Sequence, residues 1–359
     1  MSQAAIRVLV VDDSALYRQM LLNVLGRIPE VDVVGVAEDG NQAVEMVASL
    51  HPDVLTLDVQ MPGLDGIGVL RALRERGLSS RAIMVSSLTQ EGAPAATAAI
   101  FEGAFDVIAK PAGLPPHEAR EFLSRQLVEK IAVVRAASEP SKGPAGNGPA
   151  GNGPAGVARR RADKPVAVDV VAIASSTGGP PVLREILSAL PADFPAAVLV
   201  VQHMPPVFTS SLAARLDTVC PLRVVEAADH MLVEPGTVLI APGGVHLSVR
   251  RRGDAVRTLL DDAAPRHGCR PSFDVLGPSL VEAYGSRCVA VVLTGMGCDG
   301  LEACRALKAR GGTVLAQTAE TCAVFGMPKC VIEAGLADGV LPPEGVAMAL
   351  VSMARKRHA

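Results

Sequence analysis

Residues 6–14 read IRVLVVDDS, an apolar run that ends in two adjacent carboxylates. Such a run of branched residues predicts a strand buried on both faces, with Asp12 and Asp13 at its carboxyl end. In the segment that follows, 15–28, apolar residues recur at helical spacing. Because parallel strands need a long crossover, usually a helix, this order predicts a β–α unit of a parallel sheet.

The same alternation continues through the first 135 residues. Further strands are predicted at 31–37, 54–57, 82–85 and 105–109, and helices at 40–50, 64–76, 93–102 and 117–135. Five β–α units predict a doubly wound, flavodoxin-like sheet, which binds ligands at the carboxyl ends of its strands. Asp58, Ser86 and Lys110 stand at the ends of the third, fourth and fifth strands, so all three are expected at that edge.

Three carboxylates, Asp12, Asp13 and Asp58, are therefore predicted to share one edge of the sheet. They would repel one another unless a hard cation with oxygen ligands, such as Mg²⁺, lay between them. Such a cluster, with a lysine, suits acceptance of a phosphoryl group on a carboxylate. For each residue alone, the simpler interpretation is a cap on the following helix.

The motifs VVDDS, LDVQMPGLDG, VSSLT and AKP resemble those of response-regulator receiver domains. The resemblance implies that Asp58 is the phosphate acceptor, with Ser86 as switch hydroxyl and Lys110 as phosphate-binding amine. It also implies a Mg²⁺ site, whose ligands would be Asp12, Asp13, Asp58 and the carbonyl of Gln60.

A repetitive segment, GPAGNGPAGNGPAG at 143–156, follows this region. It has no large apolar side chain, so it cannot bury enough surface to offset the entropy of ordering. With its polar flanks it predicts a flexible linker over 136–165. The chain then divides into a first domain at 1–135 and a second at 166–359.

Strands and helices alternate again after the predicted linker. Strands are predicted at 168–174, 197–201, 238–241, 289–294 and 313–316, and helices at 181–189, 209–219, 273–284, 299–310, 328–334 and 343–355. A hairpin is predicted from 246–251 and 256–260, around a turn that contains Gly253. We expect a second doubly wound, Rossmann-like domain that carries this β-hairpin.

Three potentially catalytic side chains stand at predicted strand ends in the second domain. Ser176 lies in ASSTGGPP, His203 in QHMPP and Asp299 in LTGMGCDG. Alone, the serine and the aspartate would each be read as a helix cap, and the histidine as structural. Together they supply a hydroxyl, an imidazole and a carboxylate, the parts of a hydrolase triad. Ser175 remains an alternative to its neighbour.

The motifs SSTGGP, QHMPP, IAPGG, LTGMGCDG and VFGMP resemble the catalytic domain of the chemotaxis protein-glutamate methylesterases. The resemblance implies that Ser176 is the nucleophile, His203 the general base and acid, and Asp299 the carboxylate that orients the histidine. It also places the oxyanion beside the backbone N–H groups of Met296 and Thr177.

The family's activity is hydrolysis of glutamate γ-methyl esters on chemoreceptors, which releases methanol, and deamidation of receptor glutamines. The resemblance implies a phosphorylation-activated enzyme of a two-component chemotaxis pathway, with a CheA-type histidine kinase as phosphodonor. Mg²⁺ would serve phosphorylation only, and ester hydrolysis would need no cofactor. The expected protein is a cytoplasmic monomer that visits receptor arrays without inserting into the membrane, and whose unphosphorylated receiver covers the active site.

Composition limits the alternatives. Charged residues make up 20% of the 359 residues and the net charge is -3, so no global charge draws the chain to nucleic acid. Two other hypotheses remain: a regulator with a nucleic-acid-binding output, and an interaction module with an inactive hydrolase fold. The seven cysteines include no Cys-x-x-Cys pair, which favours reduced thiols, and zinc-like spacing is lacking.

Overall fold

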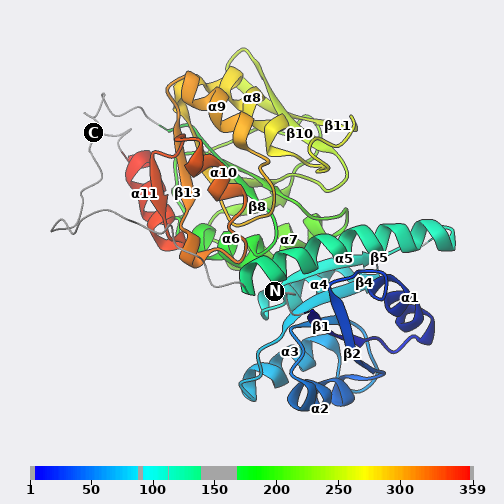
Figure 1. Cartoon of the computed structure of the whole chain (residues 1–359). Helices are drawn as coiled ribbons and strands as arrows, with labels where there is room; N and C mark the ends of the chain where they lie inside the picture. The colour runs from blue at the N-terminus through cyan, green and yellow to red at the C-terminus, as the bar shows by residue number, and fades with distance from the viewer. Residues whose placement is uncertain (1–4, 88–91, 112, 139–167, 356–359) are drawn as a thin grey trace, which may run out of the picture.

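Two parallel sheets organise the chain. The protein is described from a computed structural model that defines residues 5–87, 92–111, 113–138 and 168–355. Figure 1 shows the two α/β domains one above the other, with the N-terminal domain in blue to cyan. The fold class predicted from the sequence is thus confirmed for both domains.

The first domain alternates strictly between strands and helices. Its elements are β1 (Ile6–Val11), α1 (Ala15–Leu25), β2 (Val31–Ala37), α2 (Gly40–Leu50), β3 (Val54–Asp58), α3 (Gly66–Glu75), β4 (Arg81–Ser87), α4 (Gly92–Phe101), β5 (Asp106–Lys110) and α5 (Pro116–Ser138). The strand order is β2-β1-β3-β4-β5, and every pair is parallel. All five residues of β3 are buried, as expected for a central strand covered by helices on both faces.

The second domain has a larger sheet. Its elements are β6 (Val170–Ser175), α6 (Gly179–Ser188), β7 (Ala197–Gln202), α7 (Phe208–Asp217), β8 (Arg223–Glu226), β9 (Thr237–Ile240), β10 (His246–Arg252), β11 (Ala255–Asp261), α8 (Phe273–Tyr284), η1 (Gly285–Arg287), β12 (Cys288–Val292), α9 (Leu301–Ala309), β13 (Thr313–Gln317), η2 (Ala319–Thr321), α10 (Met327–Glu333), β14 (Gly339–Leu341) and α11 (Pro343–Arg355). The seven parallel strands run in the order β14-β13-β12-β6-β7-β9-β8, and β10 pairs with β11 as the predicted hairpin.

Alternate residues of the central strands point to opposite faces of this sheet. One face packs against α6, α7 and α11 through residues such as Leu183, Leu212 and Leu350. The other packs against α8, α9, α10 and the hairpin, with Phe273 fully buried there. Because α6 and α7 also meet the first domain, the buried cluster on their side includes residues of both domains.

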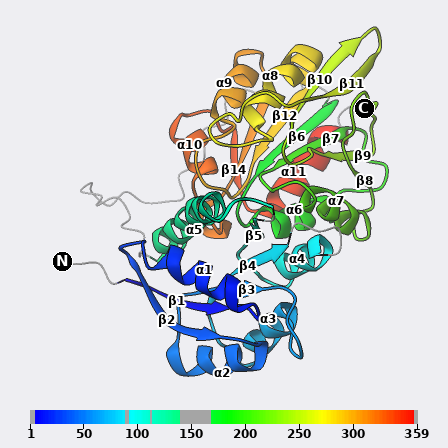
Figure 2. The same ribbon diagram turned by 90° about the vertical axis from the view of Figure 1, so that its right-hand side faces the viewer.

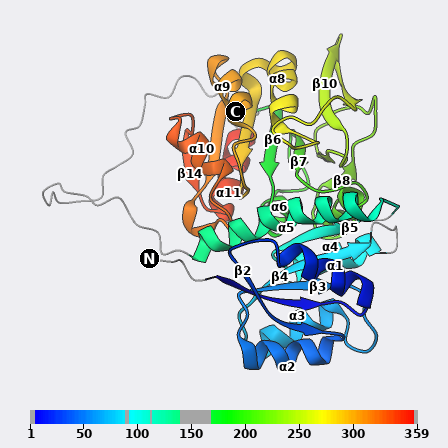
Figure 3. The same ribbon diagram turned by 45° about the vertical axis from the view of Figure 1, so that its right-hand side comes forward.

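The two domains contact each other through α4 and the start of β5. Helix α4 packs against α6 and α7 (Figure 2), and α5 runs along the boundary between the domains (Figures 1 and 3). The guanidinium of Arg184 lies over the ring of Phe101, 5.3 Å from its centroid. The Thr177 hydroxyl donates a hydrogen bond to the carboxylate of Asp106, which also pairs with Lys130 at 2.6 Å.

The predicted linker over 136–165 lies outside the described residues, except that α5 continues to Ser138. No helix within the described ranges is both long enough and apolar enough to cross a membrane.

Candidate active site and phosphoacceptor site

The two adjacent serines at the end of β6, Ser175 within the strand and Ser176 directly after it, have different surroundings. Ser175 is fully buried, and its hydroxyl donates to Oε1 of Gln202 at 2.7 Å. The amide of Gln202 in turn donates to the carbonyl of Ser176 at 2.8 Å. Ser176 is only half-buried, and its hydroxyl makes no hydrogen bond within the described part of the chain. The geometry therefore favours Ser176 over Ser175 as the reactive hydroxyl.

Two glycines allow the turn to approach its neighbours. A Cβ at Gly179 would lie 2.2 Å from Oε1 of Gln202, and one at Gly295 would lie 2.8 Å from Cβ of Ser176. Both contacts are closer than any side chain tolerates. The glycine-rich motifs thus let β6, β7 and the loop after β12 converge at Ser176.

His203 follows β7 and is held by Asp299. Its Nε2 lies 2.8 Å from Oδ2 of that carboxylate, which is 3% exposed. The structure therefore brings together two residues that the sequence analysis had placed at separate strand ends. With Nε2 occupied, Nδ1 is the nitrogen left to exchange protons with a substrate or a nucleophile.

The amino terminus of α8 orients Asp299, a contact that the sequence analysis did not predict. The Ser272 hydroxyl donates to Oδ1 at 2.6 Å, and the backbone N–H of Phe273 donates to Oδ2 at 2.7 Å. The N–H of Asp274 adds a third bond to Oδ1 at 3.1 Å. Burial alone would raise the pKa of Asp299, but hydrogen bonds from His203, Ser272 and Phe273 outweigh it and lower the pKa. The carboxylate therefore stays charged beside the imidazole.

The other side of the imidazole faces a thiol. Sγ of Cys269 lies 3.7 Å from Nδ1 of His203. Burial would lower the pKa of His203, but its interactions with Asp299 and Cys269 raise it to about 10. Both partners thus favour the protonated form of the ring, the form in which it can donate a proton or stabilise developing negative charge.

Two backbone N–H groups beside Ser176 are free to bind an oxyanion. Within the described residues, neither Met296 N–H nor Thr177 N–H has an acceptor. Met296 is 39% exposed on the loop that follows β12, and the start of α10 fixes this loop because Met327 N–H donates to the Gly295 carbonyl at 2.8 Å. These positions fit the predicted roles, which stay predictions.

Two cysteines of the same region are joined, unlike the reduced thiols that the sequence analysis favoured. Cys298, next to Asp299, forms a disulfide with Cys330 of α10. The remaining five cysteines are free thiols. The two partners are 32 residues apart, a spacing that no short cysteine motif would reveal.

The predicted phosphoacceptor site assembles at the carboxyl edge of the first sheet. Lys110 Nζ lies 2.7 Å from Oδ2 of Asp58 and 2.8 Å from Oδ2 of Asp12. Burial raises the pKa of Asp58, and the lysine opposes this only in part. Burial would lower the pKa of Lys110, but the two carboxylates raise it. The lysine thus stays charged beside the acceptor carboxylate.

A divalent cation fits this acidic cluster. Asp12, Asp13 and Asp58 each offer an oxygen, and the three oxygens lie within 4.8 Å of one another. Oδ2 of Asp12 is buried, and in the described part of the chain its partner is the Lys110 ammonium at 2.8 Å, so it keeps a lone pair for a ligand. Hard oxygen donors of this kind suit Mg²⁺. The backbone N–H of Gln60 contacts Asp58 at 3.4 Å, which brings this residue to the same site.

The predicted switch residue Ser86 is buried near the end of β4. Among the described residues, its hydroxyl makes two long contacts of 3.5 Å, to the carbonyls of Ser87 and Gly92. Its position is compatible with the predicted role, which stays a prediction.

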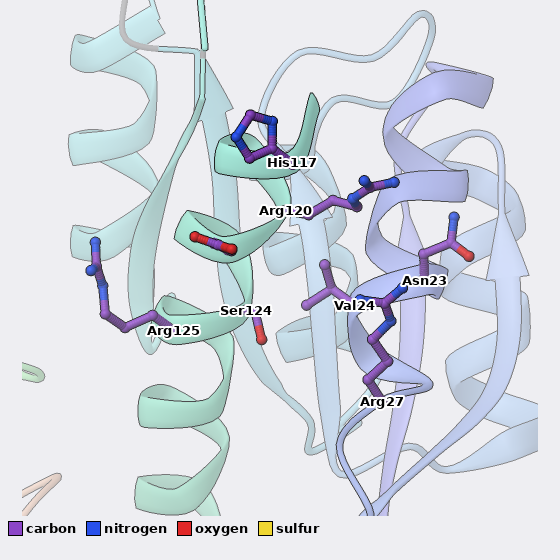
Figure 4. Close-up of a pocket in the computed structure, with 8 residues that line it drawn as sticks. Asn23, Val24, Arg27, His117, Arg120, Ser124 and Arg125 are labelled. Atoms are coloured by element: carbon purple, nitrogen blue, oxygen red, sulfur yellow. The ribbon is translucent and has the colours of Figure 1, made fainter. Parts of the chain in front are cut away.

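A separate hollow of about 370 Å³ opens between α1 and α5 on the first domain (Figure 4). Its lining comprises Asn23, Val24, Arg27, His117, Arg120, Glu121, Ser124 and Arg125. None of these residues belongs to either predicted site.

Comparisons with known proteins agree with this organisation. The family described as CheB methylesterase matches residues 171–350, and the response regulator receiver domain family matches residues 8–119. The chain is 44% identical to the protein-glutamate methylesterase/protein-glutamine glutaminase of Thermotoga maritima, over 98% of this chain and 100% of that protein. It is also 44% identical to protein-glutamate methylesterase/protein-glutamine glutaminase 5 of Myxococcus xanthus, over 95% of this chain and 96% of that protein. The crystal structure of the T. maritima CheB methylesterase catalytic domain matches with a TM-score of 0.51 and 47% identity, covering 52% of this chain and 100% of that one.

Proposed function

This chain belongs to the CheB methylesterase family, and we propose that it is a phosphorylation-activated serine hydrolase that demethylates glutamate γ-methyl esters of chemoreceptors. The observation that carries the proposal is the pairing of His203 with Asp299 at the edge of the sheet where the half-buried Ser176 follows β6. The side-chain amide of Gln202 contacts the carbonyls of both Ser176 and His203, which joins the two turns. This arrangement also argues against an inactive hydrolase fold, because burying a charged carboxylate against the histidine is costly and Asp299 is held there by three hydrogen bonds from the start of α8.

In the proposed reaction, Ser176 attacks the ester carbonyl while Nδ1 of His203 takes the hydroxyl proton. Nε2 cannot do this because it binds Asp299. The tetrahedral oxyanion lies against the N–H groups of Met296 and Thr177, each worth about 3–4 kcal/mol of barrier. The imidazolium then protonates departing methanol.

The glutamyl ester on Ser176 is hydrolysed in the second half of the reaction. His203 removes a proton from water, which attacks the acyl carbon, and the ring then returns that proton to the serine oxygen. The receptor carboxylate and the free hydroxyl are restored. A glutamine side chain would follow the same path with ammonia in place of methanol, which supports deamidation as a second activity, in line with the names of the relatives.

The receiver is proposed to control access to this site. In the structure, Asp106 of β5 binds the hydroxyl of Thr177, the residue next to Ser176, and Phe101 of α4 lies under Arg184 of α6. A protein substrate that must reach Ser176 would meet the receiver there. Phosphorylation of Asp58 would weaken this docking, and the tether proposed over 136–165 would let the receiver move away while remaining attached.

The receiver site is proposed to bind Mg²⁺ through Asp12, Asp13, Asp58 and the carbonyl of Gln60. When bound, the cation would neutralise charge on the transferred phosphoryl oxygens. Lys110 would hold the phosphorylated product, because it already contacts Asp58, and Ser86 would bond one of its oxygens. Ester hydrolysis is proposed to need no cofactor.

The proposed partners are a CheA-type histidine kinase as phosphodonor and methylated chemoreceptors as substrates. The receiver match supports the first, and the names of the relatives support the second. We propose a monomer that works in the cytoplasm and visits receptor arrays without inserting into the membrane.

Methanol release from methylated receptor membranes tests the proposal. The full chain should release methanol, and a small-molecule phosphodonor with Mg²⁺ should increase the rate. Ser176→Ala should abolish release while Asp58 still accepts phosphate, and Ser175→Ala is the matched control because its hydroxyl is buried against Gln202. An active Ser176→Ala variant would refute the assignment of the nucleophile.

A further inference from the structure

The loop between β11 and α8 carries a cysteine into contact with His203. Arg266 and Cys269 exchange backbone hydrogen bonds of 3.0 and 2.9 Å across a tight turn. His267 and Gly268 at the turn have positive φ of 52° and 77°. This turn aims Sγ of Cys269 at Nδ1 of His203, 3.7 Å away.

Cys269, His203 and Asp299 thus form a continuous array of three ionisable groups. The thiol lies at one ring nitrogen, and the carboxylate lies 2.8 Å from the other. This is the arrangement in which an imidazolium stabilises a thiolate nucleophile, while a third group orients the ring.

The other free thiols lack such a partner. Burial raises the pKa of Cys220 to about 11 and those of Cys288, Cys304 and Cys322 to about 12. Among the described cysteines that are not in the disulfide, Cys269 is the one that contacts an imidazole. It is also partly exposed with the receiver docked, so a small reagent can reach it.

We propose that Cys269 is a peroxide-reactive site whose oxidation to a sulfenic acid switches off the hydrolase centre. The thiolate sulfur attacks one oxygen of a hydroperoxide; the S–O bond forms and the O–O bond breaks. Sulfur loses two electrons to the peroxide. The leaving oxygen departs as water or an alcohol and takes its proton from the His203 imidazolium.

Oxidation of Cys269 would prevent His203 from acting as the general base for Ser176. The added oxygen would occupy the 3.7 Å gap between Sγ and Nδ1, the nitrogen that the proposed mechanism needs free. This second step rests on the proposed function, whereas the reactivity of Cys269 does not. A dithiol reductant would restore the thiol, because sulfenic acids are reversible.

The reactivity is tested by limited iodoacetamide labelling of the full chain, with each cysteine followed by mass spectrometry. Cys269 should label at least about 10-fold faster at pH 7 than Cys322, a partly exposed thiol without an imidazole. His203→Gln should reduce the labelling rate of Cys269 severalfold. The labelling rate of Cys322 should stay the same, which also shows that the fold is kept. Equal labelling of the two cysteines, or no effect of His203→Gln, would overturn the proposal.

The consequence is tested with hydrogen peroxide and a diketone that traps sulfenic acids. In the parent protein, Cys269 should form the diketone adduct. Peroxide alone should remove most of the esterase activity, and dithiothreitol should restore it. Cys269→Ser should lose a much smaller fraction of its own rate under the same treatment. If Cys269→Ser is inactivated as fast as the parent, or if no trap is found at Cys269, the switch is refuted. A chain without esterase activity but with a trapped Cys269 would refute the proposed function and keep the reactive site.

Discussion

The contact between Asp106 and Thr177 predicts how strongly the unphosphorylated receiver inhibits the enzyme. Asp106→Ala removes the acceptor of the Thr177 hydroxyl without altering the second domain. A hydrogen bond to a charged group contributes about 1.5–3 kcal/mol to the state that contains it. At about 1.4 kcal/mol per factor of ten, the open fraction should rise about 10- to 150-fold, up to full opening.

The assay is methanol release by the unphosphorylated full chain on methylated receptor membranes. Asp106→Ala should raise this basal rate and reduce the further gain from a phosphodonor, because both act on one closed-to-open equilibrium. Glu45→Ala is the matched control: its carboxylate pairs with Arg76 inside the receiver, and both side chains are largely exposed. Its basal rate should equal that of the parent.

Asp106 also pairs with Lys130 at 2.6 Å, so the substitution leaves a half-buried lysine without its partner. Lys130→Met separates the two effects, since it removes the ion pair but keeps the carboxylate that accepts from Thr177. It should raise the basal rate less than Asp106→Ala does. A folded Asp106→Ala variant with an unchanged basal rate, or an equal gain from both substitutions, would refute the inhibitory contact.

Three further predictions concern phosphorylation, pH and the disulfide. Asp58→Asn should keep the basal esterase rate but lose its increase with phosphodonor, which methanol release measures; an increase that persists would place the acceptor elsewhere. Burial lowers the pKa of His203, but its partners raise it from 6.5 to about 10, so the stabilisation is fully present below about pH 6.5 and lost as pH rises through 10. Urea unfolding of the parent and His203→Gln should therefore differ most at pH 6 and converge toward pH 10; a constant difference would contradict this. Reduction of Cys298–Cys330, which encloses 32 residues, should lower the free energy of unfolding by about 4 kcal/mol in the chain-entropy picture, and an unchanged denaturation midpoint would show that the link constrains little.

Interior strands could be predicted from the sequence because both of their faces are buried. The strand at Ile6–Val11 and the helices at Gly40–Leu50 and Phe273–Tyr284 have the predicted bounds. The two edge strands of the larger sheet, Arg223–Glu226 and Gly339–Leu341, were missed. They are three or four residues long and partly exposed, so they lack the continuous apolar run on which the prediction depended.

The positions of the candidate site followed from one rule, that parallel strands carry functional groups at their carboxyl ends. That rule placed His203 and Asp299 at one edge, and the structure pairs them. It could not place Ser272 or Cys269, which reach the site from the loop and helix start after the hairpin. One sign of this contact was present in the sequence, because Ser272 directly precedes a predicted helix. The sequence did not indicate that Asp299 is the carboxylate bound by the start of this helix.

The turn after β6 serves two purposes at once, and this links the two domains energetically. Ser176 is the proposed nucleophile. The next residue, Thr177, has the hydroxyl that binds the receiver and an N–H that finds no acceptor in the described part of the chain, where we propose that the oxyanion binds. A receptor segment seated at this turn and a docked receiver would therefore exclude each other. Because coupling between two binding events is reciprocal, a bound substrate must favour the undocked receiver by the same free energy with which docking opposes the substrate. Inhibition by the unphosphorylated receiver and release of the receiver by substrate are then two measurements of one coupling free energy.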